Sequence, residues 1–365
     1  MPTIFFTGYP GFLGSELLPL VLRRDPEAQA VCLVQGQFLD LAQERTAALA
    51  AESPELDGRI RLVVGDITEA DLGLGAERDA LAASVTEVYH LAAVYDLAVR
   101  RDLAVRVNVD GTRHVCDFAA ACPALERLHY VSTCYVSGRY AGIFREDDLV
   151  KDGQTFSNYY EETKHAAELI VRERMEGGLP VTIYRPSIVA GDSETGETQK
   201  LDGIYYVIRW VLRQPPFVAA IPVLGDPTAV RLNVVPRDAV VDAIAELSGR
   251  ADTLGQCYAI ADPEPLTISE WLDQIGAASR RRLIRVWLPV LAAKAAIDHV
   301  PFVRPVLGMP SDAADYFVHP TYYDTRNADE ALAGTGILDW DREAWARALV
   351  DFTAENMSMT SDAMV

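Results

Sequence analysis

A tyrosine and a lysine four residues apart are the side chains of this sequence best suited to proton transfer. The stretch SNYYEETKH begins at residue 157 and contains Tyr159, Tyr160 and Lys164. On a helix, side chains at i and i+4 share a face, so Tyr160 lies beside Lys164, whereas Tyr159 points about 140° away. A nearby ammonium lowers the phenol pKa from ~10 and makes a tyrosine useful as an acid or base. The alternative interpretation is an ordinary helix surface that carries aromatic residues.

A second chemical signal is the glycine-rich stretch TGYPGFLG near the start of the chain, between the apolar run TIFF and the helix-like run LLPLVLRR. Its GxxGxxG spacing allows a tight turn, close approach to a pyrophosphate and close packing of a helix on a strand. The helix N-terminus would offer free N–H groups to the phosphates. The alternative is a turn without a ligand. The residues predicted to bind a dinucleotide here are Gly8, Tyr9, Gly11, Phe12, Leu13 and Gly14.

The elements that must position these residues are strands that alternate with helices. Short runs of β-branched and apolar residues recur along the chain: TIFF, AVCLV, RIRLVV, EVYHLA, RLHYVS and VTIYRP. This alternation predicts an α/β fold, a Rossmann doubly wound parallel sheet, with a smaller, discontinuous C-terminal substrate lobe, since 365 residues exceed the ~250–300 of one core. We expect the dinucleotide-binding domain at 1–190 and 229–262, the substrate lobe at 191–228 and 263–350, and a flexible tail at 351–365.

Two further strand ends are expected to complete the cofactor pocket. The stretch VVGDIT places Asp66 and Ile67 after the third strand, where a carboxylate can accept a hydrogen bond from the adenine amino group. A turn or capping role is the alternative for Asp66. The stretch HLAA ends the fourth strand with Leu91, Ala92 and Ala93, whose small alanines leave room for the cofactor.

The second strand bears on which dinucleotide is bound. An acid at its end would bind the ribose 2′-OH of NAD, and an arginine would favour the 2′-phosphate of NADP. The stretch VCLVQGQ places Gln35 there, which does neither decisively. Because the acid is absent, NADP(H) is favoured and NAD(H) remains open, with Arg45 as a candidate partner for the phosphate.

The stretch YVSTCYVSG ends the fifth strand with two neighbouring hydroxyls, Ser132 and Thr133. Side chains alternate along a strand, so only one of the two faces the cleft. Counting back from Gly138, we predict that Thr133 binds the substrate carbonyl and the tyrosine hydroxyl. The adjacent Cys134 is not expected to accept an acyl group, because no histidine or glutamate base is placed for it.

In order along the chain, TGYPGFLG, GDIT, HLAA, NVDGT, VSTCYVSG, YEETK and YRPSIVAG resemble the extended short-chain dehydrogenases/reductases. The resemblance extends from the first strand to about residue 195 and returns at NVVPRDAVVDA. It implies hydride transfer at the nicotinamide C4, with Thr133, Tyr160 and Lys164 as the catalytic triad and Tyr160 as general acid/base. It also implies that Asn108, in NVDGT, helps to hold the lysine and a proton-relay water.

The resemblance places Pro186, Ser187 and Ile188 beside the nicotinamide, and the surrounding sequence favours one branch of the family. The stretch RPSIVAGDSETG is most similar to fatty acyl-CoA reductases and thioester reductase domains of the male-sterility type, whereas nucleotide-sugar epimerases usually carry RxxNxxGP. Later stretches, IYYVIRWVLRQPPFVAAIPV and VWLPVLAAKAAIDHVPFVRPVLG, offer apolar walls with few cations. We expect a hydrophobic substrate such as a fatty acyl thioester, a lipid ketone or a sterol. The alternative is that these stretches form only the core of the smaller lobe.

Three functions therefore remain open. The first is an NAD(P)-dependent oxidoreductase that reduces a hydrophobic carbonyl or oxidises the corresponding alcohol. The second is an NAD-dependent sugar-nucleotide epimerase or dehydratase, which would retain its NAD tightly. The third is a non-catalytic dinucleotide sensor, against which the intact triad argues.

Composition excludes several other classes. The net charge is −20 and the sequence has only four lysines, so it lacks the basic stripe that nucleic acids require. Its five cysteines form no CxxC pair and have no histidine at metal-ligand spacing, which predicts neither a metal site nor disulfides and fits a cytoplasmic location. Neither a signal peptide nor a membrane span is expected. Peripheral membrane contact remains an alternative, and the resemblance implies a homodimer.

Overall fold

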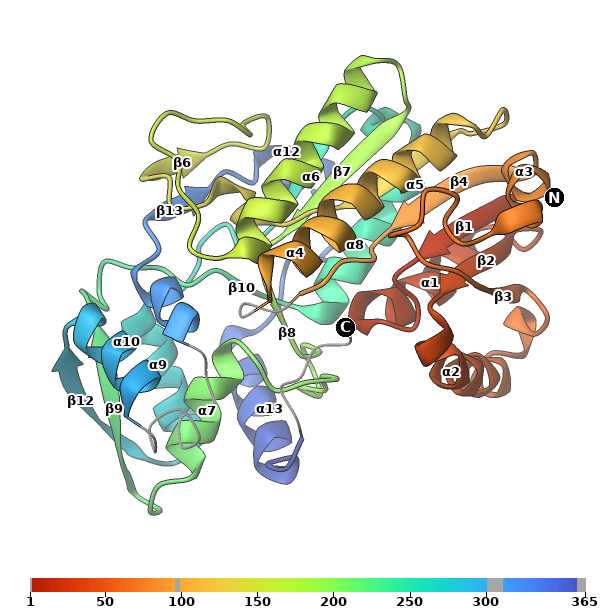
Figure 1. Cartoon of the computed structure of the whole chain (residues 1–365). Helices are drawn as coiled ribbons and strands as arrows, with labels where there is room; N and C mark the ends of the chain where they lie inside the picture. The colour runs from red at the N-terminus through yellow and green to blue at the C-terminus, as the bar shows by residue number, and fades with distance from the viewer. Residues whose placement is uncertain (1, 96–98, 301–310, 360–365) are drawn as a thin grey trace.

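The computed structural model describes residues 2–95, 99–300 and 311–359. At its centre lies a seven-stranded parallel sheet of order β11-β7-β5-β4-β1-β2-β3 (Figure 1). The strand order reverses at β1, whose two neighbours are β2 and β4, as in a doubly wound sheet. The predicted Rossmann fold is confirmed. The seven strands are β1 (Thr3–Thr7), β2 (Gln29–Val34), β3 (Ile60–Val64), β4 (Val85–His90), β5 (Arg127–Val131), β7 (Val181–Pro186) and β11 (Cys257–Ile260).

Helices cover both faces of this sheet, because each crossover between parallel strands returns over one face. One face carries α1 (Phe12–Arg24), α2 (Leu39–Glu52), α8 (Arg237–Ser248) and α12 (Arg326–Ala331). The other face carries α3 (Arg78–Ala82), α5 (Gly111–Ala120) and α6 (Tyr159–Glu176). The short α4 (Arg101–Ala104) leads through the π-helical turn η4 (Val105–Asp110) into α5.

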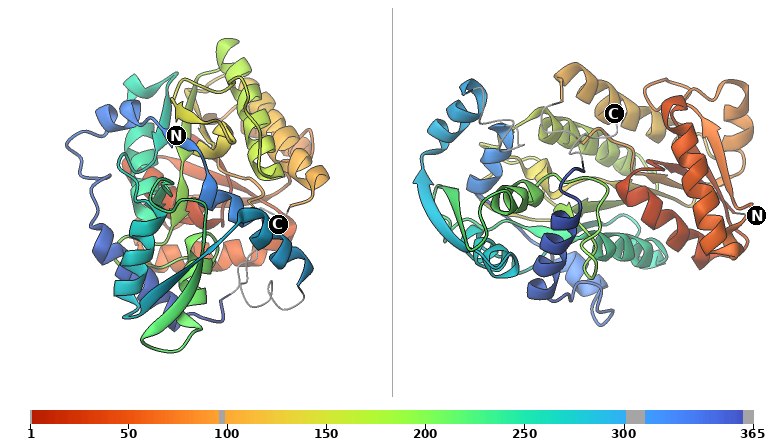
Figure 2. Two further views of the ribbon diagram at one scale, coloured as in Figure 1. Left: turned by 90° about the vertical axis from the view of Figure 1, so that its left-hand side faces the viewer. Right: turned by 90° about the horizontal axis from the view of Figure 1, so that it is seen from below.

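A second, smaller lobe has its own apolar core. It consists of α7 (Ile204–Leu212), β9 (Val218–Leu224), α9 (Ile268–Ala278), β12 (Arg282–Leu288), α10 (Val290–His299), η7 (Ser311–Val318) and α13 (Arg342–Glu355). Two short parallel pairs, β8 (Ile188–Ala190) with β10 (Val234–Pro236) and β6 (Gly142–Phe144) with β13 (Thr321–Tyr323), lie outside the main sheet. The parallel pair β9 and β12 lies at the opposite end of the molecule from β3 (Figure 2). No helix in the described ranges is long and apolar enough to cross a bilayer.

The structure corrects two of the predicted boundaries. Residues 321–332, expected in the substrate lobe, return to the dinucleotide-binding domain: β13 pairs with β6, and the backbone N–H groups of Asn327 and Ala328 donate to the buried Glu146 carboxylate at 2.6 and 3.1 Å. Residues 351–355, expected in a flexible tail, form the last turns of α13 because Thr353 is buried with the stripe of apolar residues on this helix. The last residues of the predicted tail, 360–365, and residues 301–310 of the predicted lobe lie outside the described ranges.

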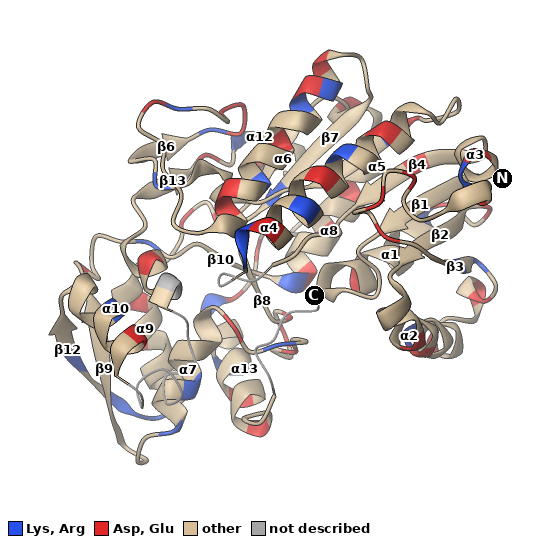
Figure 3. Cartoon of the chain, in the orientation of Figure 1, with Lys and Arg blue, Asp and Glu red and all other residues tan. Residues whose placement is uncertain are grey.

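Charge is distributed unevenly between the two lobes. Acidic side chains are spread over most helices around the central sheet, whereas β12 carries arginines and neither β9 nor β12 carries an acid (Figure 3). The excess of acids that gives the whole chain a net charge of −20 therefore does not extend to this edge of the smaller lobe.

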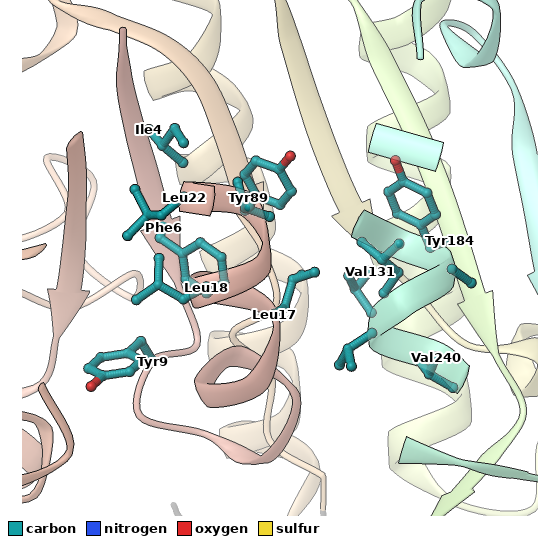
Figure 4. Packing of buried hydrophobic residues seen from close by; sticks show 14 of the residues in the cluster. Ile4, Phe6, Tyr9, Leu17, Leu18, Leu22, Tyr89, Val131, Tyr184 and Val240 are labelled. Carbon is teal, nitrogen blue, oxygen red and sulfur yellow. The ribbon is translucent and has the colours of Figure 1, made fainter. Parts of the chain in front are cut away.

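The core of the sheet follows from strand alternation. Ile4 and Phe6 of β1 point to the α1 face, and Phe5 points to the face covered by α5 and α6. On α1, Leu17, Leu18, Val21 and Leu22 recur at helical spacing and pack with Phe6 and Tyr89 (Figure 4). The position of α1, and with it the glycine turn that precedes this helix, is fixed by this packing.

A buried carboxylate on α6 holds that helix to two strands of the sheet. Glu168 accepts hydrogen bonds from Arg185 of β7 at 2.6 and 3.0 Å, from Ser132 at the end of β5 at 2.6 Å, and from Arg172 at 3.0 Å. Burial alone would raise the pKa of Glu168, but the charge and hydrogen bonds of Arg185, with those of Arg172 and Ser132, lower this pKa to about 2. The carboxylate is therefore ionised across the physiological pH range.

We predict that Glu168→Gln lowers the free energy of unfolding by roughly 3–5 kcal/mol, because the substitution leaves the buried Arg185 guanidinium without its counter-charge. Urea unfolding measures the loss. The matched control is Glu162→Gln on the same helix, whose ion pair with Arg101 is exposed to solvent, so its loss should change stability far less. Equal losses for the two variants would contradict the assigned role.

The Glu168–Arg185 ion pair also predicts how the free energy of unfolding changes at acidic pH. The folded pKa of Glu168, about 2, lies below the ~4.3 of an unfolded glutamate, so its contribution is complete above that value and is lost as the pH falls toward 2. The stability difference between the wild type and Glu168→Gln should therefore shrink over this acidic window, as urea unfolding at several pH values would show.

Candidate active site

A cavity of about 870 Å³ opens at the carboxyl ends of the parallel strands, where the strand order reverses. In open parallel sheets this crevice is where ligands bind. Every residue predicted to bind the cofactor lines the cavity, and so do Thr133, Tyr160 and Lys164. Asn108 is the one predicted site residue that is not part of the lining.

The glycine turn forms the cavity wall between β1 and α1. Gly8 has a φ of +93°, and a Cβ there would lie 2.9 Å from the Leu91 side chain. A Cβ on Gly14 would lie 2.4 Å from the Gly8 carbonyl oxygen, which itself accepts a hydrogen bond from the Gly11 N–H at 2.8 Å. No side chain caps the N-terminus of α1, so its first N–H groups can serve a phosphate. This cradle fits a dinucleotide pyrophosphate and would not form with larger residues.

The ends of β2 and β3 meet at one side of the cavity. Gln35 donates from Nε2 to Asp66 Oδ2 at 3.0 Å, while the other oxygen of Asp66 caps a backbone N–H two residues on, as the turn interpretation predicted. Arg45 donates to Ser15 Oγ at 2.9 Å and to the Pro10 carbonyl, beside the glycine turn. A guanidinium, and no acid at the end of β2, therefore faces this part of the cavity.

Tyr160 projects into the cavity from the first turn of α6. This helix begins after Asn158, whose side chain accepts the Glu161 N–H at 3.0 Å as an N-cap. Tyr160 is buried, lies beside the Thr133 side chain and meets the Tyr95 ring edge-on at 4.9 Å between centroids. Burial raises the pKa of Tyr160 well above its ordinary value, against the opposing hydrogen bond of Thr133. Tyr160 is therefore a neutral phenol at neutral pH, which is the form that can deliver a proton.

The two hydroxyls at the end of β5 point in different directions. Ser132 donates to Glu168 at 2.6 Å and is committed to the buried ion pair. Thr133 lies beside Tyr160 and donates to the Pro186 carbonyl at 3.3 Å. Strand alternation thus brings Thr133, as predicted from the sequence, next to the tyrosine.

Lys164 lies at the base of the cavity with its ammonium group against β5. Its Nζ donates to the Tyr130 hydroxyl at 3.1 Å and to the Val131 carbonyl at 2.9 Å. Burial lowers the pKa of Lys164 to about 7, although the Glu168 carboxylate opposes the shift. A charged lysine has three N–H donors, so one donor remains for a cofactor ribose hydroxyl.

Asn108 occupies the π-helical turn η4 and lies fully buried against α6. Its side chain accepts the Val94 N–H at 2.8 Å, and its Nδ2 donates to the Val94 carbonyl at 3.3 Å and to Thr163 Oγ1 at 3.0 Å. Asn108 therefore joins the loop after β4 to α6 through the neighbour of Lys164. The structure shows no direct hydrogen bond between Asn108 and Lys164 itself.

The segment after β7 supplies the wall opposite the glycine turn. Pro186, Ser187 and Ile188 line the cavity, and Ser187 Oγ is buried without a hydrogen-bond partner among the described residues. A buried hydroxyl that lacks a partner costs free energy unless a ligand completes it. A carboxamide bound at this wall would supply that partner, which fits the predicted position of a nicotinamide.

An aromatic wall completes the cavity, and the sequence predicted only part of it. The rings of Tyr95, Tyr135, Tyr206, Tyr316 and Phe317 all line the cavity on the side of the smaller lobe. Tyr95 and Tyr135 lie within the stretches HLAAVYD and VSTCYVSG, so their place beside the cleft could have been expected. Tyr206 belongs to IYYVIRWVLRQPPFVAAIPV, a stretch expected to form such a wall, whereas Tyr316 and Phe317 come from a segment whose path to the site is not visible in local sequence.

A buried acid next to Tyr160 was also missed. Glu161 Oε2 accepts the Ser157 N–H at 2.8 Å, and its Oε1 has no hydrogen-bond partner among the described residues. Burial raises the pKa of Glu161 to about 7. Tyr316 of η7 lies beside this carboxyl group and accepts a hydrogen bond from Asn158 Nδ2 at 3.2 Å, so η7 covers the start of α6.

The cysteine beside Thr133 is not available for chemistry. Cys134 is buried, donates to the Arg185 carbonyl at 3.0 Å and does not line the cavity. Burial raises the pKa of its thiol well above the ordinary value. In the described part of the chain, no cluster of three or more His, Cys, Asp or Glu side chains could hold a metal ion.

A fold and site of this kind define an NAD(P)-dependent oxidoreductase of the extended short-chain dehydrogenase/reductase type. The family model described as "Male sterility protein", an NAD-binding family, matches residues 6–244, and the chain belongs to this family. A curated relative, a linear gramicidin synthase from Brevibacillus parabrevis, is 29% identical over 297 residues, which cover 74% of this chain and 6% of the relative. Aldehyde reductase lnbA from Aspergillus flavus is 26% identical over 334 residues, which cover 86% of this chain and 32% of that protein. The chain thus spans less than a third of the length of each.

Solved structures resemble the whole chain. The terminal R domain from the myxalamid PKS-NRPS biosynthetic pathway has a TM-score of 0.79 and 28% identity, covering 99% of this chain and 92% of that domain. UDP-glucuronic acid 4-epimerase from Bacillus cereus, solved in complex with NAD, has a TM-score of 0.65 and 18% identity, covering 99% of both chains. The second likeness concerns the fold alone.

The buried lysine predicts a specific pH dependence of stability without cofactor. The folded pKa of Lys164 is about 7 and that of an unfolded lysine ~10.4, so between these values the unfolded chain binds a proton that the folded chain does not. Stability should therefore rise with pH across this window by an amount that Lys164→Met removes.

Urea unfolding at about pH 6, 7.5 and 9 measures the effect. The advantage of Lys164→Met over the wild type should be largest at the lowest pH and shrink toward the highest. Lys151→Met, which removes a lysine outside the cavity, is the matched control. A difference between wild type and Lys164→Met that does not change with pH would contradict the burial of this amine.

Proposed function

We propose that this chain is an NADPH-dependent reductase that converts an acyl thioester with a hydrophobic acyl group into an aldehyde. The observation that carries the proposal is the neutral, buried Tyr160 at the junction between the glycine cradle and a wall of aromatic side chains. A protonated phenol suits reduction, in which the substrate oxygen must gain a proton. The family match and the similarity to a terminal R domain support a reductase.

The residues of the site divide the reaction between them. When bound, the nicotinamide supplies a hydride from C4 to the carbonyl carbon. Thr133 turns its single O–H from the Pro186 carbonyl, 3.3 Å away, to the substrate oxygen and polarises the carbonyl, and Tyr160 delivers its proton to that oxygen as the C=O π bond opens. The product is a hemithioacetal; its C–S bond then breaks, the thiol leaves with a proton and the aldehyde remains. Overall, thioester, NADPH and one proton yield aldehyde, thiol and NADP⁺.

Lys164 has a supporting part in this scheme. Two of its donors hold Tyr130 and Val131, and the third would reach a ribose hydroxyl of the cofactor. The negative charge of a bound dinucleotide would favour the ammonium form. Cofactor binding would thereby convert a half-neutral amine into the cation that stabilises a Tyr160 phenolate after proton transfer.

The preference for NADPH rests on the pocket at the end of β2. Gln35 there is turned onto Asp66, so no carboxylate is free to accept the two hydroxyls of an NAD ribose. Arg45 lines the same cavity beside the glycine turn and could pair with a 2′-phosphate.

The hydrophobic character of the substrate rests on the smaller lobe. Of the described lining residues that this lobe and its linker contribute, Lys200 is the one cation. It pairs with Asp202 at 2.5 Å and lies 4.2 Å from the centre of the Tyr95 ring. A sugar-nucleotide diphosphate would need more unpaired positive charge, whereas an acyl chain suits the tyrosine and phenylalanine wall.

We predict that Tyr160→Phe lowers kcat by about 10²–10⁴-fold while NADPH affinity stays close to that of the wild type, because the substitution removes only the transferable proton. The assay follows loss of reduced-nicotinamide absorbance with a panel of long-chain acyl-CoAs, ketosteroids and UDP-sugars, and cofactor titration by nicotinamide fluorescence. Tyr159→Phe is the matched control, since the neighbouring ring is 45% exposed and lies outside the cavity lining.

Each outcome distinguishes the alternatives. Oxidation of NADPH by acyl-CoA with release of thiol supports the proposal, and oxidation by a ketosteroid alone would replace the substrate class. Tightly retained NAD with UDP-sugar conversion and no net oxidation would indicate an epimerase. Unchanged turnover in Tyr160→Phe would overturn the assigned proton donor.

A further inference from the structure

The smaller lobe presents an apolar edge to solvent. Along β9, β12 and the start of α10, large hydrophobic side chains are exposed rather than buried; we call this set the β9–β12 edge, and its members are Phe217, Val218, Ile284, Val286, Trp287 and Leu291. Phe217 is 81% exposed, Trp287 67% and Leu291 83%. Exposed apolar residues scattered singly need no explanation, but a contiguous group marks an interaction surface.

Strand register brings these residues together. The parallel pairing sets Ile284 opposite Ala220 and Val286 opposite Pro222, so two β12 side chains lie on the same face of the pair. The Arg282 N–H donates to the Phe217 carbonyl at 2.9 Å, which places the turn before β9 at the first residue of β12. Val218 lies on the same face as Ile284 and Val286, whereas Trp287 alternates onto the other face, so the exposed set wraps around the unpaired side of β12 and joins two segments more than sixty residues apart in the sequence.

Phe217 carries backbone strain as well as exposure. Its φ is +80°, a region that a bulky side chain rarely adopts. Neither packing within the chain nor backbone preference therefore explains a phenylalanine at this turn. Strain held at an exposed aromatic residue is typical of a site that serves a ligand or partner.

The charge of this edge is opposite to that of the chain. Residues 203–225 and 274–297 contain no aspartate or glutamate, although the net charge of the chain is −20. The cations of these two segments are Arg209, Arg213, Arg280, Arg281, Arg282, Arg285 and Lys294. Arg280 and Arg282 are exposed, and neither forms an ion pair with any residue that the structure describes. Arg282 is joined to the exposed Phe217 through its backbone, and Arg280 lies two residues before it in the sequence.

We propose that the β9–β12 edge is a docking surface for an anionic lipid bilayer. Phe217, Trp287 and Leu291 enter the interface between head groups and acyl chains, and Arg280 and Arg282 contact head-group phosphates. Combined aromatic, aliphatic and basic side chains on one surface are what such interfaces bind. This inference concerns attachment and is independent of the reaction proposed above.

Addition of a partner strand fits the same edge less well. The backbone of Ala220, in the middle of β9, is already satisfied by the Gln214 side chain, which accepts its N–H at 2.8 Å and donates to its carbonyl at 2.9 Å. The Trp210 indole donates to that carbonyl as well, at 2.8 Å. The open side of β9 is therefore closed to another chain, as edge strands are often protected.

Vesicle flotation of the full chain tests the proposal. We expect binding to phosphatidylcholine vesicles that contain phosphatidylglycerol, weakening with added salt, and little binding to phosphatidylcholine alone. Trp287 should shift its emission to the blue and be quenched by brominated lipid. The double variant Arg280→Asn and Arg282→Ser should bind roughly 30-fold more weakly, from the contribution of about two basic residues.

Phe217→Asn separates membrane contact from folding. Asparagine tolerates a positive φ, so this variant should be at least as stable as the wild type and yet bind vesicles more weakly. The matched control is Ile143→Ser with Val150→Ser, which removes exposed apolar side chains near β6, away from the edge, and should bind as the wild type does. All variants should titrate NADPH as the wild type does, whatever the outcome for turnover.

Three results would overturn the proposal. The first is absence of binding to phosphatidylglycerol vesicles by the wild type. The second is equal binding by wild type, edge variants and control. The third is a dimer in light scattering that Phe217→Asn converts to monomer without any lipid effect, which would make the edge an interface between two copies of the chain.

Discussion

The Glu168 carboxylate is the interaction on which the geometry of the site depends. It is ionised and buried, and it binds Ser132, directly after β5, and Arg185 on β7 while it belongs to α6 itself. Thr133 follows the first of these partners, and Pro186 follows the second. A single charge therefore fixes three elements that each carry a predicted catalytic or nicotinamide-binding residue. A buried carboxylate is tolerated when a counter-charge and hydrogen bonds satisfy its two oxygens. Here the Glu168 carboxylate accepts four strong hydrogen bonds.

Near Glu168, burial determines the protonation states of Tyr160 and Lys164. Tyr160 and Lys164 both lie in a desolvated pocket, so each favours its neutral form without cofactor. A site with a neutral phenol and a half-neutral amine holds a proton in position for transfer. At the other end of the cavity, the cradle formed by Gly8 and Gly14 suits anions, because the uncapped backbone N–H groups at the start of α1 can donate to phosphates.

Much of this arrangement could be predicted from the sequence, because it depends on local patterns. Strand and helix periodicity gave the parallel sheet, glycine spacing gave the cradle, and strand alternation separated Thr133 from Ser132. The burial of Glu161 could not be foreseen, since it depends on Tyr316, which lies more than 150 residues away in the sequence. The return of residues 321–332 was missed for the same reason: it depends on pairing with β6 and on Glu146, neither of which leaves a local pattern.

The most direct test of the central claim is hydride transfer itself. The measurement uses NADPH that carries deuterium at the transferred C4 position, a long-chain acyl-CoA, and mass spectrometry of the product together with thiol determination. The account predicts an aldehyde with a single deuterium at its carbonyl carbon and one free thiol for each NADPH oxidised. An unlabelled product, or labelled cofactor recovered unchanged while substrate is converted, would contradict it.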